Sequence, residues 1–409
     1  MTKLFYFLIL SLIIISCSAS KEVKNTKKGI TEEINALYSL KKFNGFAVAV
    51  VDENGLLYQN GFGWADVAGQ KKYTTETVQN IGSVSKTLVG IALMKAQELG
   101  KLKLDDPIEQ YLDFKVFNPK FPNVKITVRQ LATHTSSIVD NEYYSYRNYY
   151  LKAGQDLKGM KMTFEDDQNF NPADSIISMK RYFENVLTEN GKWKNGSFSE
   201  NSPGSIYEYS NVATALAAYI IEKAMGQSFR DFTKEYILKP LKMKDSGWRF
   251  IDVDFSKYSR LYENPSLPLP YYELITYPDG GFITNVNDLS KYLSELISGY
   301  NGNGRILSAE SYREYFKPQL SESQFTERNT KNPYNESYNV GILMGFGYTG
   351  YIGHTGGDPG TMSMLFFDPK TKLGRIMILN TNFSDKEGNK VFFEIWNTLE
   401  KYQSRLKHK

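Results

Sequence analysis

The sequence has very little cysteine and histidine. Its 409 residues include one cysteine, Cys17, and three histidines. A single cysteine excludes a disulfide within the chain. So few thiolate and imidazole ligands also argue against a zinc enzyme, whose metal is usually held by several such groups. The composition therefore predicts neither a metal site nor an organic cofactor.

An excess of charge of one sign is also missing. The formal net charge is +4, and 23% of the residues are charged. This small excess is spread along the chain, and no basic stripe alternates with aromatic residues as in proteins that bind nucleic-acid strands. With 41% hydrophobic residues, the chain can bury a core and is not of the disordered class. We expect a globular protein without a nucleic-acid partner.

Long apolar runs are absent beyond the first residues. Residues 4–15 are apolar and follow Lys3, but a membrane-spanning helix needs roughly 20 such residues. The run is typical of a signal peptide, and its end at Cys17 resembles a bacterial lipobox. The alternative is a plain signal peptide with an incidental cysteine. We expect a signal peptide over 1–16, a flexible lipid-anchored tether over 17–29, and an exported, membrane-anchored lipoprotein of the bacterial cell envelope.

Hydrophobic periodicity divides the rest of the chain. Short strand-like runs lie near both ends, and helical spacing dominates the middle. The strands are expected at 45–51, 56–64, 340–346, 362–367 and 375–380, and the main helices at 30–42, 84–99, 212–224, 285–298 and 388–402. This order predicts an α/β (α+β) fold in which both chain ends build one antiparallel sheet flanked by helices. The sheet domain would comprise 30–80 and 270–405, and a mainly helical domain, 81–269, would be inserted.

A serine and a lysine three residues apart begin the first long helix of the middle region. Ser83 and Lys86 would share one face of its first turn. A buried lysine can lose its proton near neutral pH and serve as the base of a serine nucleophile. The spacing alone is weak, because serines 18, 39 and 404 begin the same pattern. In isolation it would usually be a helix cap beside a solvated lysine.

Two further short motifs stand in informative places. Tyr209 and Asn211 directly precede a long apolar helix, and His354-Thr355-Gly356 adjoins a strand. In the same order along the chain lie the matching stretches Ile81–Thr87, Leu102–Ile108, Ile126–Ser136, Pro203–Gly204, Gly280–Gly281 and Gly353–Gly357. Together they make the chain similar to the class C β-lactamase and DD-peptidase superfamily of penicillin-recognising serine hydrolases. The resemblance covers about residues 30 to 400 and implies an active site between a sheet domain and a helical domain.

The resemblance also implies a role for each motif residue. Ser83 would be the acyl-forming nucleophile, Lys86 its proton acceptor, and Tyr209 the group that passes the proton to the leaving group. Asn211 would hydrogen-bond Lys86 or a substrate amide. The backbone N–H groups of Ser83 and Gly357 would form the oxyanion hole. The residues implied to bind substrate are Asn211, His354, Thr355, Gly356 and Gly357.

Two departures from the pattern bear on the substrate. There is no Ser-Asp-Asn sequence, which disfavours a class A arrangement. His354 stands where many relatives carry lysine, so a permanent charge is exchanged for one that titrates near neutrality. The second change shifts the expectation away from an efficient β-lactamase without excluding one.

The sequence thus predicts a serine hydrolase that forms a covalent acyl-enzyme on amide, β-lactam or ester carbonyls. The candidate substrates are small D-amino-acid peptides of cell-wall type, β-lactams and small esters. One alternative is an esterase of the same family. Another is a non-catalytic wall-binding relative, for which loss of Ser83, Lys86 or Tyr209 would be expected, but all three are present.

Overall fold

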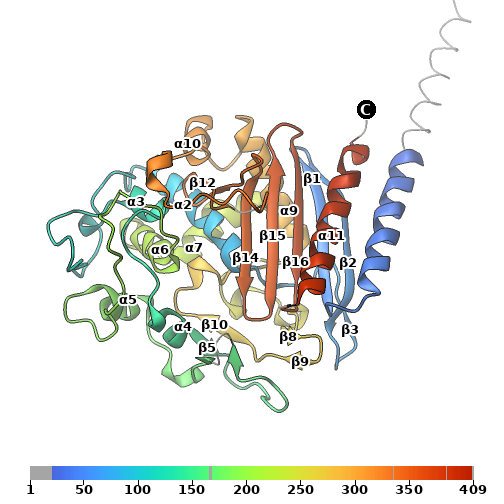
Figure 1. Ribbon diagram of the computed structural model, residues 1–409, viewed down its shortest axis with the longest axis horizontal. Helices are drawn as coiled ribbons and strands as arrows, with labels where there is room; N and C mark the ends of the chain where they lie inside the picture. Colours follow the sequence, from blue (N-terminus) through green and yellow to red (C-terminus); the bar gives the residue numbers. More distant parts are fainter. Residues whose placement is uncertain (1–20, 165–167, 335, 384, 408–409) are drawn as a thin grey trace, which may run out of the picture.

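An antiparallel sheet of eight strands joins the two ends of the chain (Figure 1). The computed structural model describes residues 21–164, 168–334, 336–383 and 385–407. From one edge to the other the strands are β12 (Asn339–Val340), β13 (Gly345–Phe346), β14 (Ile352–Asp358), β15 (Thr361–Asp368), β16 (Leu373–Leu379), β1 (Gly45–Asp52), β2 (Gly55–Asp66) and β3 (Lys71–Lys72). Phe46 pairs with Leu379, so the first and last long strands are neighbours. The predicted α/β fold is confirmed.

Alternating side chains of β1 bury both faces of the sheet, as period-2 geometry requires. Phe46, Val48 and Val50 join the core beneath α11 (Lys386–Gln403) and the N-terminal helix, residues 21–38. Ala47, Ala49 and Val51 join the core on the other face, which α9 (Val286–Tyr300) covers. All eight residues of β1 are buried. The sheet is therefore sandwiched between two helical layers.

The N-terminal helix starts earlier than predicted. Residues 21–38 are helical, so residues 21–29 are not the expected flexible tether. The helix is tied to α11 through Glu33, which accepts hydrogen bonds from Lys401 at 2.7 Å and from Tyr402 at 3.1 Å. The predicted signal peptide and Cys17 lie outside the described residues. Of the described helices, none combines the length and the apolar character needed to cross a membrane.

The chain between β3 and the C-terminal strands folds into a mainly helical region, most of which lies on the β14 side of the sheet (Figure 1). Its long helix α6 (Asn211–Met225) is buried over ten consecutive residues and packs on α2 (Ser85–Glu98). Gly226 ends α6 at φ 66°, as its sequence position predicts. The other helices are α3 (Val128–Ala132), α4 (Glu142–Asn148), α5 (Met179–Leu187), α7 (Phe229–Thr233), α8 (Lys239–Leu241) and α10 (Ala309–Tyr315).

The strand predicted over 340–346 is broken in two. Between β12 and β13 the chain leaves the sheet, because the Ile342 N–H donates to Tyr315 O and the Leu343 N–H to Ala132 O. Leu343 takes a φ of 55° in the bend. These bonds to α10 and to the end of α3 replace the ladder that an uninterrupted strand would have formed. Apolar periodicity alone does not reveal such a competition.

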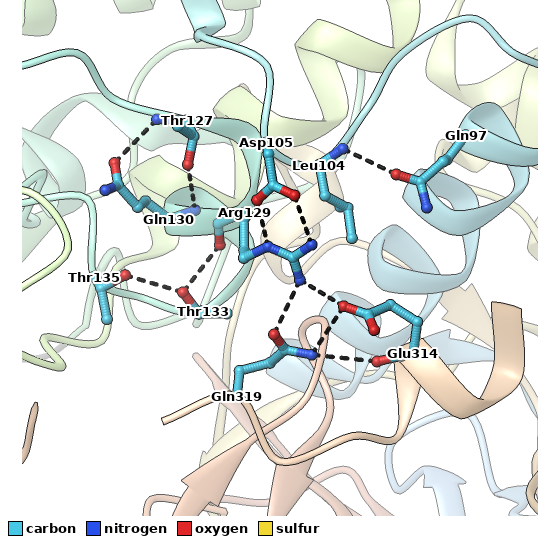
Figure 2. A network of polar contacts seen from close by, with 10 residues as sticks. All are labelled: Gln97, Leu104, Asp105, Thr127, Arg129, Gln130, Thr133, Thr135, Glu314 and Gln319. Atoms are coloured by element: carbon cyan, nitrogen blue, oxygen red, sulfur yellow. Dashed lines mark hydrogen bonds and ion pairs between the residues drawn. The ribbon is translucent and has the colours of Figure 1, made fainter. Parts of the chain in front are cut away.

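A hydrogen-bonded brace holds α3 against α10 (Figure 2). Arg129 on α3 binds both oxygens of Asp105, at 2.6 and 3.0 Å, and Glu314 on α10 at 2.6 Å. Thr127 begins α3 with a capping box, in which Gln130 is its partner. Two of the stretches that carried the family resemblance therefore serve the framework. They anchor the loop that leads from α3 toward the catalytic motifs.

Candidate active site

Two glycines let the serine motif press against the sheet. Ser83 lies in a short 3-10 turn, Gly82–Val84, directly before α2. Gly82 has a φ of 52°, and a Cβ there would lie 2.7 Å from Gly357 N. A Cβ on Gly356 would lie 2.1 Å from Ile81 O. Close backbone approach therefore demands glycine at both positions. Gly356, expected to bind substrate, has this packing function in the structure.

Ser83 and Lys86 meet as the helical spacing predicts. The Lys86 ammonium donates to Ser83 Oγ at 2.9 Å, to Asn211 Oδ1 at 2.6 Å and to the Asp279 carbonyl at 2.6 Å. Three acceptors match the three N–H donors of a lysine. Lys86 is fully buried. The structure thus places a fully buried lysine nitrogen beside a serine hydroxyl.

Burial is the main influence on the charge of Lys86. It lowers the pKa of Lys86 below the ordinary 10.5, although nearby carboxyl groups act in the opposite direction. Those groups belong to Asp279, Asp140, Asp358 and Glu336. The buried amine gives up its proton more readily than an exposed lysine. A neutral amine next to Ser83 is the form that can accept a proton.

Tyr209 lies on the other side of Lys86. The ammonium is 5.1 Å from the centre of the Tyr209 ring. Burial raises the pKa of Tyr209 well above 10, and a hydrogen bond with Ser83 opposes that shift. The phenol therefore keeps its proton at neutral pH and can donate it. The Tyr209 hydroxyl forms a hydrogen bond with Ser83, and it is a phenol rather than a phenolate before substrate binds.

His134 supports Tyr209 from behind. The two rings lie 4.6 Å apart, tilted by 31°. His134 Nδ1 accepts from the Ser210 N–H at 3.1 Å, and its carbonyl accepts from the Glu208 N–H at 2.7 Å. The backbone on both sides of Tyr209 is thus tied to one histidine. His134 therefore has a structural role, which is to hold the backbone around Tyr209.

Asp140 orients Asn211 at the start of α6. Its Oδ2 accepts from Asn211 Nδ2 at 2.7 Å, which turns the amide oxygen toward Lys86. Asp140 also accepts from the Ser210 hydroxyl and from the backbone N–H groups of Asn211 and Val212. A carboxylate at a helix N-terminus is favoured by the helix dipole. No local pattern marks this residue in the sequence, because it lies 71 positions before Asn211.

His354 is buried on β14 and is not poised as a cation. Its Nδ1–H donates to Thr355 O at 2.6 Å. Burial lowers the pKa of His354 below 6.5, the Lys86 charge adds to this, and Glu336 opposes it. The titration that the sequence placed near neutrality therefore moves to lower pH. At pH 7 the ring is neutral.

Thr355, the next residue, is bonded to a carboxylate. Its hydroxyl lies 3.0 Å from both Glu336 Oε1 and Oε2. Glu336 Oε1 is 3.7 Å from His354 Nδ1. The Glu336 side chain is only 12% exposed. Sequence reasoning missed Glu336, because no motif or periodicity marks it.

Ser83 opens into a polar pocket of about 320 Å³. Asp140, Asp279 and Asp358 line it, with Asn211, Gly280 and Gly357 among its other walls. Tyr144 donates to Asp279 Oδ1 at 3.0 Å and Tyr149 to Asp358 Oδ1 at 2.8 Å. Tyr144 and Tyr149, two of the tyrosines that cluster between residues 143 and 150, thus contribute to the pocket wall. Within the described ranges, no three histidine, cysteine, aspartate or glutamate side chains are gathered as a metal site would need.

The chain is similar to known proteins over most of its length. The family described as Beta-lactamase matches residues 34–400. The serine beta-lactamase-like protein LACTB, mitochondrial, of Homo sapiens is 27% identical over 391 residues, which cover 80% of this chain and 69% of that protein.

Two solved structures share the fold. The octameric penicillin-binding protein homologue from Pyrococcus abyssi has a TM-score of 0.68 and 22% identity, with 92% of this chain and 77% of that one covered. The beta-lactamase/D-alanine carboxypeptidase from Yersinia pestis has a TM-score of 0.65 and 16% identity, with 93% and 98% covered.

Proposed function

Because the chain belongs to the Beta-lactamase family, we propose that Ser83 is the nucleophile and Lys86 the base of its hydrolytic reaction. The protein is a serine hydrolase of this family, whose members act on peptide and β-lactam substrates. The observation that carries the assignment is the 2.9 Å contact between Ser83 Oγ and a fully buried Lys86 Nζ.

The reaction proceeds in two halves. Neutral Lys86 accepts the proton of Ser83 Oγ as that oxygen attacks the substrate carbonyl, and an ester to Ser83 forms. The N–H groups of Ser83 and Gly357 hold the carbonyl oxygen as it becomes negative. Tyr209 passes a proton to the departing group, and water then cleaves the ester and regenerates Ser83. Asn211, held by Asp140, keeps Lys86 in line with the serine.

A covalent probe tests the assignment directly. The purified full chain is incubated with a fluorophosphonate, which phosphonylates activated serines, and its intact mass is measured. One adduct on the wild type and none on Ser83→Ala is expected. Labelling of Ser83→Ala at the wild-type rate would overturn the assignment. Full labelling of Lys86→Ala would support Ser83 as the nucleophile but contradict the assignment of Lys86 as its base.

We propose further that Cys17 carries a lipid and holds the enzyme to the cell envelope. The support is the twelve-residue apolar run of residues 4–15 directly before Ser16 and Cys17. Cells expressing the full chain would be fed an alkyne fatty acid and fractionated. Label and membrane association are expected for the wild type and not for Cys17→Ser. An unlabelled wild-type chain would contradict the anchor.

A further inference from the structure

We propose that Glu336 sets the charge preference of the active site: it excludes substrates that carry a carboxylate on the leaving group and admits those with a neutral or cationic group there. The inference rests on the proposed function of Ser83. It concerns the leaving-group side of the site, where the ring of His354 on β14 lies 6.2 Å from the ring of Tyr209, the proposed proton donor to the leaving group.

Glu336 occupies the hydrogen-bonding position of Thr355. A hydroxyl has one proton to donate, and both oxygens of Glu336 lie 3.0 Å from the Thr355 oxygen. Thr355 is two residues before Gly357, which lines the pocket with Ser83. A second carboxylate arriving at this threonine would have to displace the one already there.

The position of Glu336 is built into the fold. A Cβ on Gly345 of β13 would lie 1.9 Å from the Cβ of Glu336. Only glycine at 345 leaves room for Glu336 to lie against the strand. The side chain is 12% exposed, so little water screens its charge. Glu336 is therefore a fixed, weakly screened anion beside the catalytic cluster.

The hydrogen-bond donors of Lys86 and His354 already have acceptors within the protein. Lys86 donates to Ser83, Asn211 and Asp279 O, and His354 donates to Thr355 O. A substrate carboxylate would thus meet a like charge without a compensating donor from these residues. Like charges brought together at a binding site are strongly unfavourable. An ammonium or a neutral amide meets no such penalty.

The adjoining pocket has the same character. Asp140 and Asp358 line it, and among its described lining residues none is lysine, arginine or histidine. Asp279 also lines it, but burial raises its pKa to about 8, so it adds little negative charge at neutral pH. Asp140 and Asp358 together with Glu336 also act on the charge of Lys86. The acidic groups therefore surround the serine from both the pocket and the Glu336 side. This arrangement attracts cationic substrates and repels anionic ones.

Three thioesters with one shared acyl group provide the test. Each carries N-benzoylglycine. The thioglycolate and thioglycolamide leaving groups are similar in size and differ in charge, and thiocholine adds a larger, cationic leaving group. Thiol release by the full chain gives kcat/KM for each. We expect the wild type to favour the amide and thiocholine thioesters over the carboxylate one by about tenfold or more. A preference for thioglycolate would overturn the inference.

The variant Glu336→Gln keeps the shape and removes the charge. It is expected to reduce the discrimination against thioglycolate, taken as the ratio of kcat/KM for thioglycolamide to that for thioglycolate, by about tenfold. Glu336→Ala should do the same, so a folding defect in one variant does not hide the effect. Glu322→Gln is the matched control, because Glu322 is exposed and paired with Arg328. An unchanged ratio in both Glu336 variants would contradict the proposal.

The ratio of kcat/KM between the thioglycolamide and thioglycolate thioesters separates this inference from the proposed function. A general structural defect would lower all three rates together and leave the ratio as it was. If none of the thioesters reacts while the fluorophosphonate still labels Ser83, the charge preference is wrong and the nucleophile stands. If Ser83 is not labelled at all, the proposed function itself fails, and the inference fails with it.

Discussion

Asp140 Oδ2 lies 2.7 Å from Asn211 Nδ2, and through this bond it decides which atom of Asn211 faces the lysine. The amide oxygen is left pointing at Lys86 Nζ, 2.6 Å away. The same carboxylate accepts the first N–H groups of α6. One residue thus joins the start of a helix to the electrostatics of the catalytic lysine.

The first prediction concerns Asp140. Asp140→Ala should slow fluorophosphonate labelling of Ser83 by at least about tenfold, because Asn211 loses the partner that orients it. It should also lower the free energy of unfolding by about 1–3 kcal/mol, because the first N–H groups of α6 lose their acceptor. Labelling kinetics and urea unfolding measure the two effects.

Ser228→Ala is the control for Asp140. Ser228 caps α7 through the Asp231 N–H at 3.0 Å, and it is not among the residues that line the Ser83 pocket. Its loss should lower stability by a comparable amount and leave labelling unchanged. Equal labelling rates in Asp140→Ala and Ser228→Ala would show that Asp140 acts on the fold alone.

The second prediction is the pH dependence of acylation. The reactive form of Lys86 is neutral, so the labelling rate of Ser83 should rise with pH as Lys86 loses its proton. Because burial lowers the pKa of Lys86, the rise should level off below pH 10.5. Lys86→Arg, which stays protonated, should label slowly at every pH. A wild-type rate that is flat from pH 5 to 10 would contradict the assignment.

The third prediction concerns the buried Asp279. Burial raises its pKa to about 8, so the folded state holds this proton more tightly than the unfolded state does. The contribution to stability is therefore present at low pH and is lost as pH rises from about 4 to about 8. Asp279→Asn should remove that decline, which can reach about 1.4 kcal/mol per pH unit.

Urea unfolding at several pH values checks the Asp279 prediction. Asp279→Asn should gain stability relative to the wild type as pH increases through this window. The exposed Asp174 provides the control, because Asp174→Asn removes a carboxylate without a buried proton. Parallel wild-type and Asp279→Asn curves would show that the carboxyl proton is not held by the fold.

The fourth prediction tests the close approach of the serine turn to β14. Gly356→Ala places a methyl group 2.1 Å from Ile81 O, so the turn must move away from the strand. The free energy of unfolding should fall by about 1–3 kcal/mol, and Ser83 labelling should slow. Gly29→Ala is the control, because its methyl would meet nothing nearer than 3.6 Å in a helix and should be neutral or stabilising. Wild-type behaviour of Gly356→Ala would contradict the packing role.

Local features of the structure were readable from the sequence because their causes are local. The spacing of Ser83 and Lys86 on one helical turn, the Thr127 capping box and the Gly226 helix end each depend on residues within a few positions. The two-sided burial of β1 follows from its continuous apolar run. The family resemblance placed the catalytic motifs in one site, and the structure brings Tyr209 and Asn211 to Lys86.

The charges around that site were decided by the tertiary structure alone. Asp140, Asp279 and Glu336 come from three separate segments, and each influences Lys86 only after the chain has folded. The neutral state of His354 likewise follows from its burial rather than from its residue type. The sequence determined the sheet, the helices and the Ser83–Lys86 pair, because helix and strand periodicity are short-range. Substrate charge preference depends on desolvation and on distances between remote side chains, and those arise only from packing.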